Sequence, residues 1–224
     1  MGFAREGNIP GFYKRSDAFV LGACVSPAEL YDDAEQSGTR LALTDGGDDV
    51  VTDRLYQAVR KVAKERESLS HPAVKLAPAR DVEVGKAVTA AVKAGKALST
   101  FEPFGRDVAR SAFLCTARGG LSLVASVESQ SCFDNAFLEL LTSPRTEKET
   151  ALTTSAVRQL CDQLFERGTV GCFALSPTRD TGLGAIYANA GFRRTGTLRQ
   201  HVLLAGERVD VFLWSRKLAQ PADS

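Results

Sequence analysis

Short apolar runs alternate with longer segments of helical spacing between residues 73 and 217, and this alternation is the strongest constraint on the fold. Short runs of apolar and β-branched residues predict strands, whereas apolar residues at every third or fourth position predict helices. The predicted order is strand, helix, three strands, helix, strand, helix and two strands, at residues 74–77, 81–98, 112–116, 121–127, 135–142, 146–167, 170–175, 184–190 and 196–217. This order is typical of a mixed β-sheet flanked by helices, so we expect an α/β fold.

The first 72 residues have a different pattern. Residues 2–24 are typical of two short extended pieces separated by turn residues. Ser26, Pro27 and Glu29 form a capping-box pattern that predicts a short helix. From Val50 onward, apolar residues recur at helical spacing, and the basic side chains lie mostly on other faces of this helix. That basic surface fits either an anionic partner or a solvated connector, and we interpret residues 26–72 as a helical connector.

An internal repeat links the two ends of the chain. Residues 2–7 (GFAREG) resemble residues 191–196 (GFRRTG), and an Asp-x-Phe strand follows each copy, at Asp17 and at Asp210. Either the match is due to chance, or residues 1–25 are the closing strands of a unit like the one at residues 73–218, which a tail at 219–224 follows. On the second interpretation, the edge of the first strands must be covered by another part of the chain, by a protein partner or by a second copy.

Composition excludes several classes of function. Lys and Arg number 28 against 27 Asp and Glu, so no strong charge predicts a nucleic acid or an anionic membrane as partner. No apolar run has the length of a membrane span, and no secretory signal opens the chain, so we expect a cytoplasmic protein. The five cysteines are scattered and the two histidines lie far apart, which argues against a disulfide framework and a metal site. We expect the cysteines to be small buried residues.

The segment after the strand at 170–175 carries the clearest motif. Tyr187, Gly191 and Phe192 are spaced as Y-x-x-x-G-F, which resembles the signature of the GNAT acetyltransferase superfamily. The resemblance covers residues 73 to about 218 in element order as well. The closing segment from Gly196 to Trp214, together with I-P-G-F-Y at residues 9–13, is similar to the β-lysine N-acetyltransferase group. The resemblance implies a GNAT-like fold, acetyl-CoA as co-substrate and a primary amine, perhaps lysine-like, as acceptor.

Two residues are candidates for proton transfer. Tyr187 stands where the family places its general acid, although a buried tyrosine with a satisfied hydroxyl is the alternative. Glu139 lies in an apolar strand, where burial should raise the pKa of a carboxyl and suit it to act as a base near neutral pH. A buried glutamate paired with an arginine is the alternative for Glu139, and Glu128 is a second candidate base.

The resemblance also implies a binding site for acetyl-CoA. The backbone of Leu140, Leu141 and Thr142 would pair with the pantetheine arm, and the start of the helix at 146–167 would hold the pyrophosphate. This chain lacks the glycines of the family's phosphate loop and has Arg145, Lys148, Glu149 and Thr150 there. The segment 146–149 is itself a capping box, whose side chains would occupy the amides that a phosphate needs. Asp180 stands where many members have a CoA-contacting Asn, and a simple helix cap is its alternative role.

Two functions therefore remain open. The first is acetyl transfer from acetyl-CoA to a primary amine, possibly that of an amino acid, with Glu139 as base and Tyr187 as acid. The second is a catalytically degenerate fold of the same kind that acts as a protein-binding or regulatory subunit. The altered phosphate loop favours the second function, because Glu147 and Glu149 would repel a pyrophosphate.

Overall fold

The computed structural model describes residues 3–13, 16–22, 50–101, 109–118, 122–130 and 132–218. The helix expected after Ser26, the turn at residues 119–120 and the tail at 219–224 lie outside these ranges. Within them, no helix is long and apolar enough to cross a membrane, and no group of three His, Cys, Asp or Glu side chains is placed to hold a metal ion.

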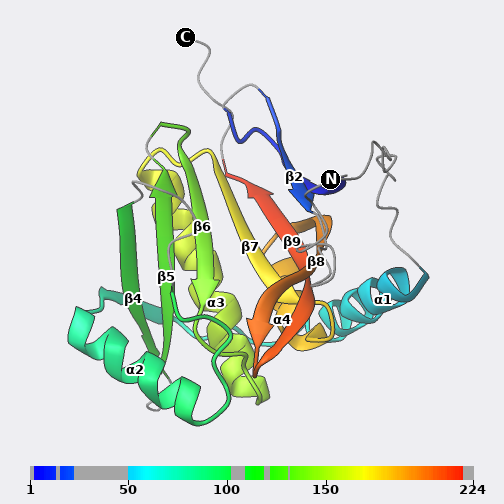
Figure 1. Cartoon of the computed structure of the whole chain (residues 1–224). Helices are drawn as coiled ribbons and strands as arrows, with labels where there is room; N and C mark the ends of the chain where they lie inside the picture. The colour runs from blue at the N-terminus through cyan, green and yellow to red at the C-terminus, as the bar shows by residue number, and fades with distance from the viewer. Residues whose placement is uncertain are drawn as a thin grey trace, which may run out of the picture.

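The described strands form a single nine-stranded sheet in the order β2-β1-β8-β9-β7-β6-β5-β4-β3 (Figure 1). All neighbouring strands run antiparallel except β6 and β7, which are parallel, so the sheet is mixed as predicted. The strands are β1 (Ala4–Ile9), β2 (Ala18–Gly22), β3 (Val74–Pro78), β4 (Ala109–Ala117), β5 (Ser122–Gln130), β6 (Asn135–Leu140), β7 (Gly171–Pro177), β8 (Arg193–Leu204) and β9 (Glu207–Lys217).

Among the described residues, four helices cover the sheet: α1 (Val50–Glu65), α2 (Asp81–Lys93), α3 (Glu147–Glu166) and α4 (Thr181–Asn189). Helices α1, α3 and α4 share one apolar core with alternate residues of the central strands, such as Leu138. Helix α2 packs in a separate cluster with Phe101 and Leu141. It ends at Lys93, earlier than the predicted residue 98, and Gly95 follows with a φ of +61°. A positive φ is incompatible with helix continuation and favours glycine.

Helix α1 belongs to the core, so the prediction of a solvated connector is wrong for residues 50–65. Val59 is fully buried, and a Cβ added to Gly184 of α4 would lie 3.0 Å from a methyl group of Val59. The ring of Tyr56 packs on those of Phe212 and Trp214, at centroid distances of 6.0 and 6.2 Å. The basic residues of α1 conceal this packing face in the sequence, because long charged side chains can surround a narrow apolar stripe.

The internal repeat is present in the structure. Hairpin β1–β2 and hairpin β8–β9 have the same pairing, since Gly7 faces Val20 as Gly196 faces Leu213. Each hairpin has an irregularity immediately before this glycine. Four other pairs of the first hairpin have an equivalent in the second: Ala4–Gly22 corresponds to Arg193–Ser215, Arg5–Leu21 to Arg194–Trp214, Asn8–Phe19 to Thr197–Phe212, and Ile9–Ala18 to Leu198–Val211.

Side-chain contacts repeat as well. The amide of Gly11 donates to Asp17 at 2.8 Å, and the amide of Gln200 donates to Asp210 at 2.8 Å. The guanidinium of Arg5 lies over the ring of Phe19 at 4.0 Å, and that of Arg194 lies over the ring of Phe212 at 5.5 Å. A correspondence in pairing, hydrogen bonding and ring contacts argues against a chance match of two short sequences.

The two hairpins meet edge to edge. Gly7 pairs with Gly196 in antiparallel strands, so the two copies are related by a local twofold axis through this pair. A Cβ on Gly196 would collide with the backbone of Glu6 and Gly7, which explains why glycine is required there. The edge of β1 is thus covered by β8 of the same chain, one of the possibilities that the sequence left open. No strand among the described residues pairs with the outer edge of β2.

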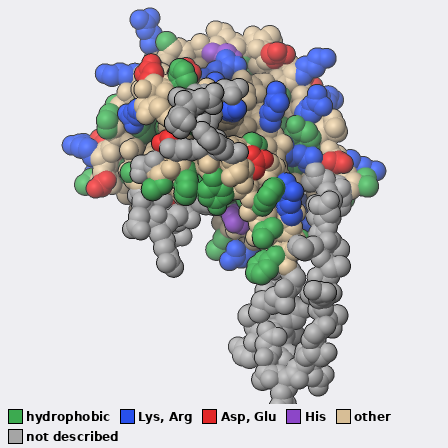
Figure 2. Space-filling view, turned by 90° about the horizontal axis from the view of Figure 1, so that it is seen from above, with side chains coloured by type: hydrophobic (Ala, Val, Ile, Leu, Met, Phe, Trp, Pro, Cys, Tyr) green, Lys and Arg blue, Asp and Glu red, His purple; other side chains and the backbone are tan. Residues whose placement is uncertain are grey.

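The described cysteines are all free thiols. Cys115, Cys161 and Cys172 are buried as predicted, whereas Cys132 is exposed because it lies in the turn between β5 and β6; Cys24 lies outside the described residues. Basic and acidic side chains are interspersed over the face seen in Figure 2.

Candidate functional site

The centre of the candidate site is the point where two parallel strands separate. Strands β6 and β7 pair from Asn135–Gly171 to Leu138–Ala174, and pairing stops there although both strands continue. A narrow cavity of about 50 Å³ lies at this divergence, between Leu140 of one strand and Pro177 of the other. Glu139 and Tyr187 also line it. The sheet therefore opens between the two residues that the sequence singled out for proton transfer.

Tyr187 is held rigidly on α4. Its ring packs on Phe192 and Trp214, at centroid distances of 5.4 and 6.2 Å, and only 1% of the residue is exposed. Tyr187 lines the small cavity, and its role as general acid stays a prediction. Burial raises the pKa of Tyr187 well above its usual value, and nearby thiols and Glu139 add to the effect. The hydroxyl thus holds its proton until an acceptor more basic than water forms beside it.

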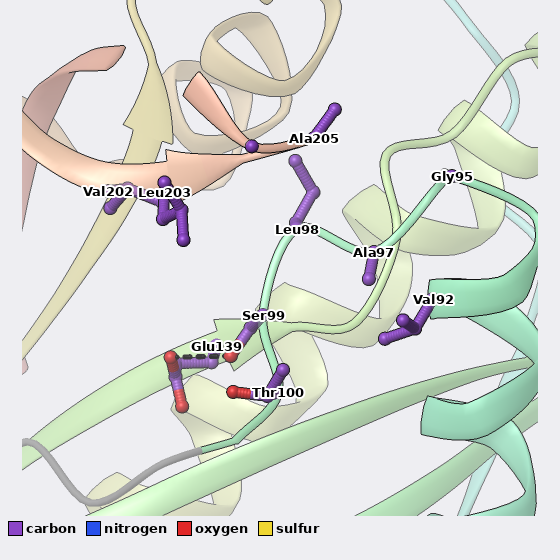
Figure 3. Close-up of a pocket in the computed structure, with 11 residues that line it drawn as sticks. Val92, Gly95, Ala97, Leu98, Ser99, Thr100, Glu139, Val202, Leu203 and Ala205 are labelled. Atoms are coloured by element: carbon purple, nitrogen blue, oxygen red, sulfur yellow. Dashed lines mark hydrogen bonds between the residues drawn. The ribbon is translucent and has the colours of Figure 1, made fainter. Parts of the chain in front are cut away.

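Glu139 reaches the divergence from β6. Its carboxylate accepts hydrogen bonds from the hydroxyls of Ser99 at 2.8 Å and Ser126 at 3.4 Å (Figure 3). Burial raises the pKa of Glu139, as predicted, while the two hydroxyls and the charge of Arg110 partly oppose that shift. A carboxyl with a raised pKa is a stronger base than an ordinary glutamate.

Arg110 is a site residue that the sequence analysis missed. Its guanidinium lies 3.0 Å from a carboxylate oxygen of Glu128 and 3.8 Å from one of Glu139. Strand pairing brings the three together, since Arg110 faces Glu128 across β4 and β5, and Ser126 faces Glu139 across β5 and β6. The arginine pairing considered for Glu139 therefore exists, and it coexists with a raised pKa. The hairpin turn expected at 119–120 could have predicted the pairing of Arg110 with Glu128, because two strands joined by a turn there place residues 110 and 128 opposite each other.

A larger cavity opens on the Glu139 side. It has a volume of about 470 Å³ and lies between the segment that follows α2 and the tip of hairpin β8–β9 (Figure 3). An irregularity in β8 between Leu198 and Val202, where Gln200 has a φ of +46°, bends this strand. Val202 and Glu139 line both cavities, so the larger one is adjacent to the divergence of the strands.

The start of α3 is capped by its own side chains. Thr146 accepts a hydrogen bond from the amide of Glu149 at 3.2 Å. The carboxylate of Glu149 accepts from the amides of Arg145 at 2.7 Å and Thr146 at 3.1 Å. These two amides lower the pKa of Glu149. The predicted capping box is confirmed, and it occupies three amides that could otherwise face a phosphate.

The remaining predicted contacts with CoA are placed as follows. Leu140 is buried and lines the small cavity. Both backbone groups of Leu141 are used within the chain, by Val124 and Leu98, so its backbone is turned away from the divergence. Thr142 pairs with Ala97 in an isolated bridge. Arg145 and Lys148 are exposed at the start of α3, whereas Thr150 is buried.

Asp180 acts as the N-cap of α4. Its side chain accepts a hydrogen bond from the amide of Leu183 at 2.9 Å, the capping role that the sequence offered as an alternative. A contact between Asp180 and CoA stays a prediction.

Solved structures with the same fold are GNAT acetyltransferases. Spermidine N-acetyltransferase SpeG from Vibrio cholerae, in complex with CoA and spermine, matches with a TM-score of 0.53 and 12% identity, over 66% of this chain and 96% of its own. A mutant of that enzyme matches with a TM-score of 0.53 and 12% identity, over 64% of this chain and 95% of its own. No protein-family model and no curated sequence matches the chain. The predicted GNAT-like fold is confirmed, and the resemblance to the β-lysine group stays a prediction.

Proposed function

We propose that this protein transfers the acetyl group of acetyl-CoA to a primary amine. The observation that carries the proposal is the divergence of β6 and β7, where a cavity is lined by a carboxyl with a raised pKa and by a buried tyrosine. Direct acetyl transfer needs a base at the amine and an acid at the leaving thiolate. The same fold holds CoA together with an amine in the Vibrio cholerae enzyme.

Each residue has a defined role in this proposal. Glu139 accepts a proton from the ammonium group of the acceptor, directly or through water, and Ser99 and Ser126 orient its oxygens. Tyr187 donates its proton to the sulfur as the carbon–sulfur bond breaks. The backbone of β6 beyond Leu138, which has no strand partner on the β7 side, would hold the pantetheine arm.

The start of α3 supports a second candidate function. Its capping box and the carboxylates of Glu147 and Glu149 oppose a pyrophosphate at the position where a helix N-terminus would otherwise attract one. A protein with the cavity at the divergence of β6 and β7 but without affinity for phosphates would serve as a protein-binding or regulatory subunit.

Calorimetric titration with acetyl-CoA separates the two functions, followed by an assay of released CoA thiol with a panel of primary amines. Micromolar binding and turnover support the enzyme, whereas a folded chain that does not bind millimolar acetyl-CoA supports the binding subunit.

For the enzyme, Tyr187→Phe should lower kcat by about tenfold to a hundredfold or more with little change in KM, because it removes the acid alone. Phe192→Leu, which changes a neighbour of Tyr187, is the packing control. Unchanged turnover in Tyr187→Phe would exclude Tyr187 as the acid.

A further inference from the structure

Much of the wall of the larger cavity is formed by apolar side chains. Val92 of α2, Leu98, and Val202 and Leu203 of β8 provide its hydrocarbon surface. Among the described residues that line it, Glu139 is the sole ionisable side chain, and the hydroxyls of Ser99 and Thr100 lie beside it. In Figure 3, Val202 and Leu203 come from the hairpin, on the opposite side from Ser99 and Thr100. The polar side chains of the described lining residues thus lie at one end, close to the divergence of β6 and β7.

The outer part of the cavity contains apolar side chains that water can reach. Val92 is 53% exposed and Leu203 is 63% exposed. They come from different elements, and both line this cavity. Exposed apolar side chains that converge on a hollow are typical of a site that gains free energy when an apolar ligand covers it.

We propose that the acceptor is a primary monoamine with an apolar body, an alkylamine or arylalkylamine, rather than a polyamine or an amino acid. This inference rests on the proposed acetyl transfer and specifies its substrate class. The ammonium group would lie at Glu139, and the hydrocarbon body would cover Leu98, Val202 and Leu203.

The reaction of such an amine balances within the site. The ammonium nitrogen loses one proton to Glu139, and the resulting amine forms a bond to the acetyl carbon while the bond from that carbon to sulfur breaks. The thiolate takes a proton from Tyr187, and the tyrosinate takes the second proton from the nitrogen. Glu139 then releases its proton to solvent. The products are a neutral N-alkylacetamide and CoA thiol, and the amide retains the apolar body that the walls contact.

A second charge on the acceptor would be unfavourable in this cavity. The far ammonium of a diamine would meet Val92 and Leu203, with no carboxylate other than Glu139 among the described lining residues, and a carboxylate there would meet no lysine or arginine among those residues. A charged group that loses water without gaining a partner costs free energy. The cavity is open to solvent, so we expect a moderate discrimination of about tenfold to a hundredfold rather than exclusion.

Three acceptors of matched length test the proposal: hexylamine, hexamethylenediamine and aminocaproate. They present the same primary amine, and they end in a methyl group, an ammonium and a carboxylate. The expected result is a kcat/KM for hexylamine at least about tenfold above both others. Equal or higher values for the diamine or the amino acid would overturn the proposal. Absence of acetylation with all three and with spermidine and lysine, despite acetyl-CoA binding, would instead refute the proposed function.

A pair of variants tests the position of the apolar body. Leu203→Asp places a carboxylate at the mouth, and Leu203→Asn has the same shape without the charge. We expect Leu203→Asp to shift the ratio of kcat/KM for diamine over monoamine upward by about tenfold relative to Leu203→Asn. Leu203 is exposed, so both variants should fold, and equal thermal midpoints would verify this. An unchanged ratio in folded Leu203→Asp would place the acceptor body elsewhere and overturn the assignment.

Discussion

The capping box at the start of α3 should weaken CoA binding, and Glu149 is the residue with which to test this. Glu149→Ala releases the amides of Arg145 and Thr146, which the carboxylate now holds at 2.7 and 3.1 Å, and it removes a negative charge from the expected phosphate position. Glu149→Gln removes the same charge but keeps an oxygen that can accept from the amides. The two variants therefore separate the effect of charge from the effect of amide availability.

The magnitude follows from the two effects. Removing one partly screened like charge near a pyrophosphate contributes about 1 kcal/mol. Two amides made available to an anion contribute about 1 kcal/mol more, after the loss of their present bonds is counted. We expect Glu149→Ala to lower the Kd for CoA by about thirtyfold, and Glu149→Gln by about fivefold. Glu149→Ala should also lower the free energy of unfolding by about 1 kcal/mol, since a helix cap is lost.

Isothermal titration measures both Kd values, and acetyl-pantetheine is the matched control ligand because it lacks the pyrophosphate. Its affinity should be the same in the parent chain and in both variants. If the affinity for acetyl-pantetheine rises as much as the affinity for CoA, the effect comes from the cavity at the divergence of β6 and β7 and not from the phosphates. If neither variant changes the Kd for CoA, the capping box does not compete with phosphate and the reasoning is wrong.

Three further predictions concern Glu139, its neighbour Arg110, and the pairing of Gly7 with Gly196. Burial raises the pKa of Glu139, so the fall of kcat/KM on acidification should occur at a pH above 4.5, the usual pKa of a glutamate. For the same reason, the folded state should lose stability as pH rises from 4.5 through that raised pKa. Glu139→Gln should show neither dependence in pH–rate profiles and urea titrations. Arg110→Met removes a charge that lowers the pKa of Glu139, so the acidic limb of the pH–rate profile should move to higher pH, and a profile that does not move would contradict this role. Glu128→Gln in the same chain should restore stability and move the limb part of the way back, because the charge of Glu128 raises the pKa of Glu139. Gly196→Ala should destabilise the chain by about 1–3 kcal/mol in urea titrations, because its Cβ meets the backbone of Glu6 and Gly7, whereas Gly85→Ala in α2 should be neutral or stabilising.

Local sequence patterns were sufficient to predict most of the elements from residue 74 onward. The strands and helices lie close to their expected positions because each has a periodic apolar pattern and clear ends. The capping box at Thr146 and the cap at Asp180 were predictable for the same reason, since each is formed by residues three positions apart.

The parts that were missed depend on partners distant in the sequence. Arg110 becomes a site residue through the register of three strands, and Val59 of α1 becomes a core residue through α4, which follows it by more than a hundred positions. The larger cavity depends on the irregularity in β8, where Gln200 adopts a positive φ that its residue type does not predict. Val59 lies in a segment with a periodic apolar pattern, but that pattern does not show which element covers it.

The pairing of β1 with β8 has a consequence for self-association. In a sheet that ended at β8, the unpaired amides and carbonyls of that strand would be open to the same strand of another molecule. Here an internal copy of the closing hairpin occupies this edge, in the antiparallel orientation that a twofold-related molecule would adopt. The chain therefore satisfies within itself an association that would otherwise require two molecules. At this end of the sheet, further growth is confined to β2, where Phe19 and Leu21 are exposed.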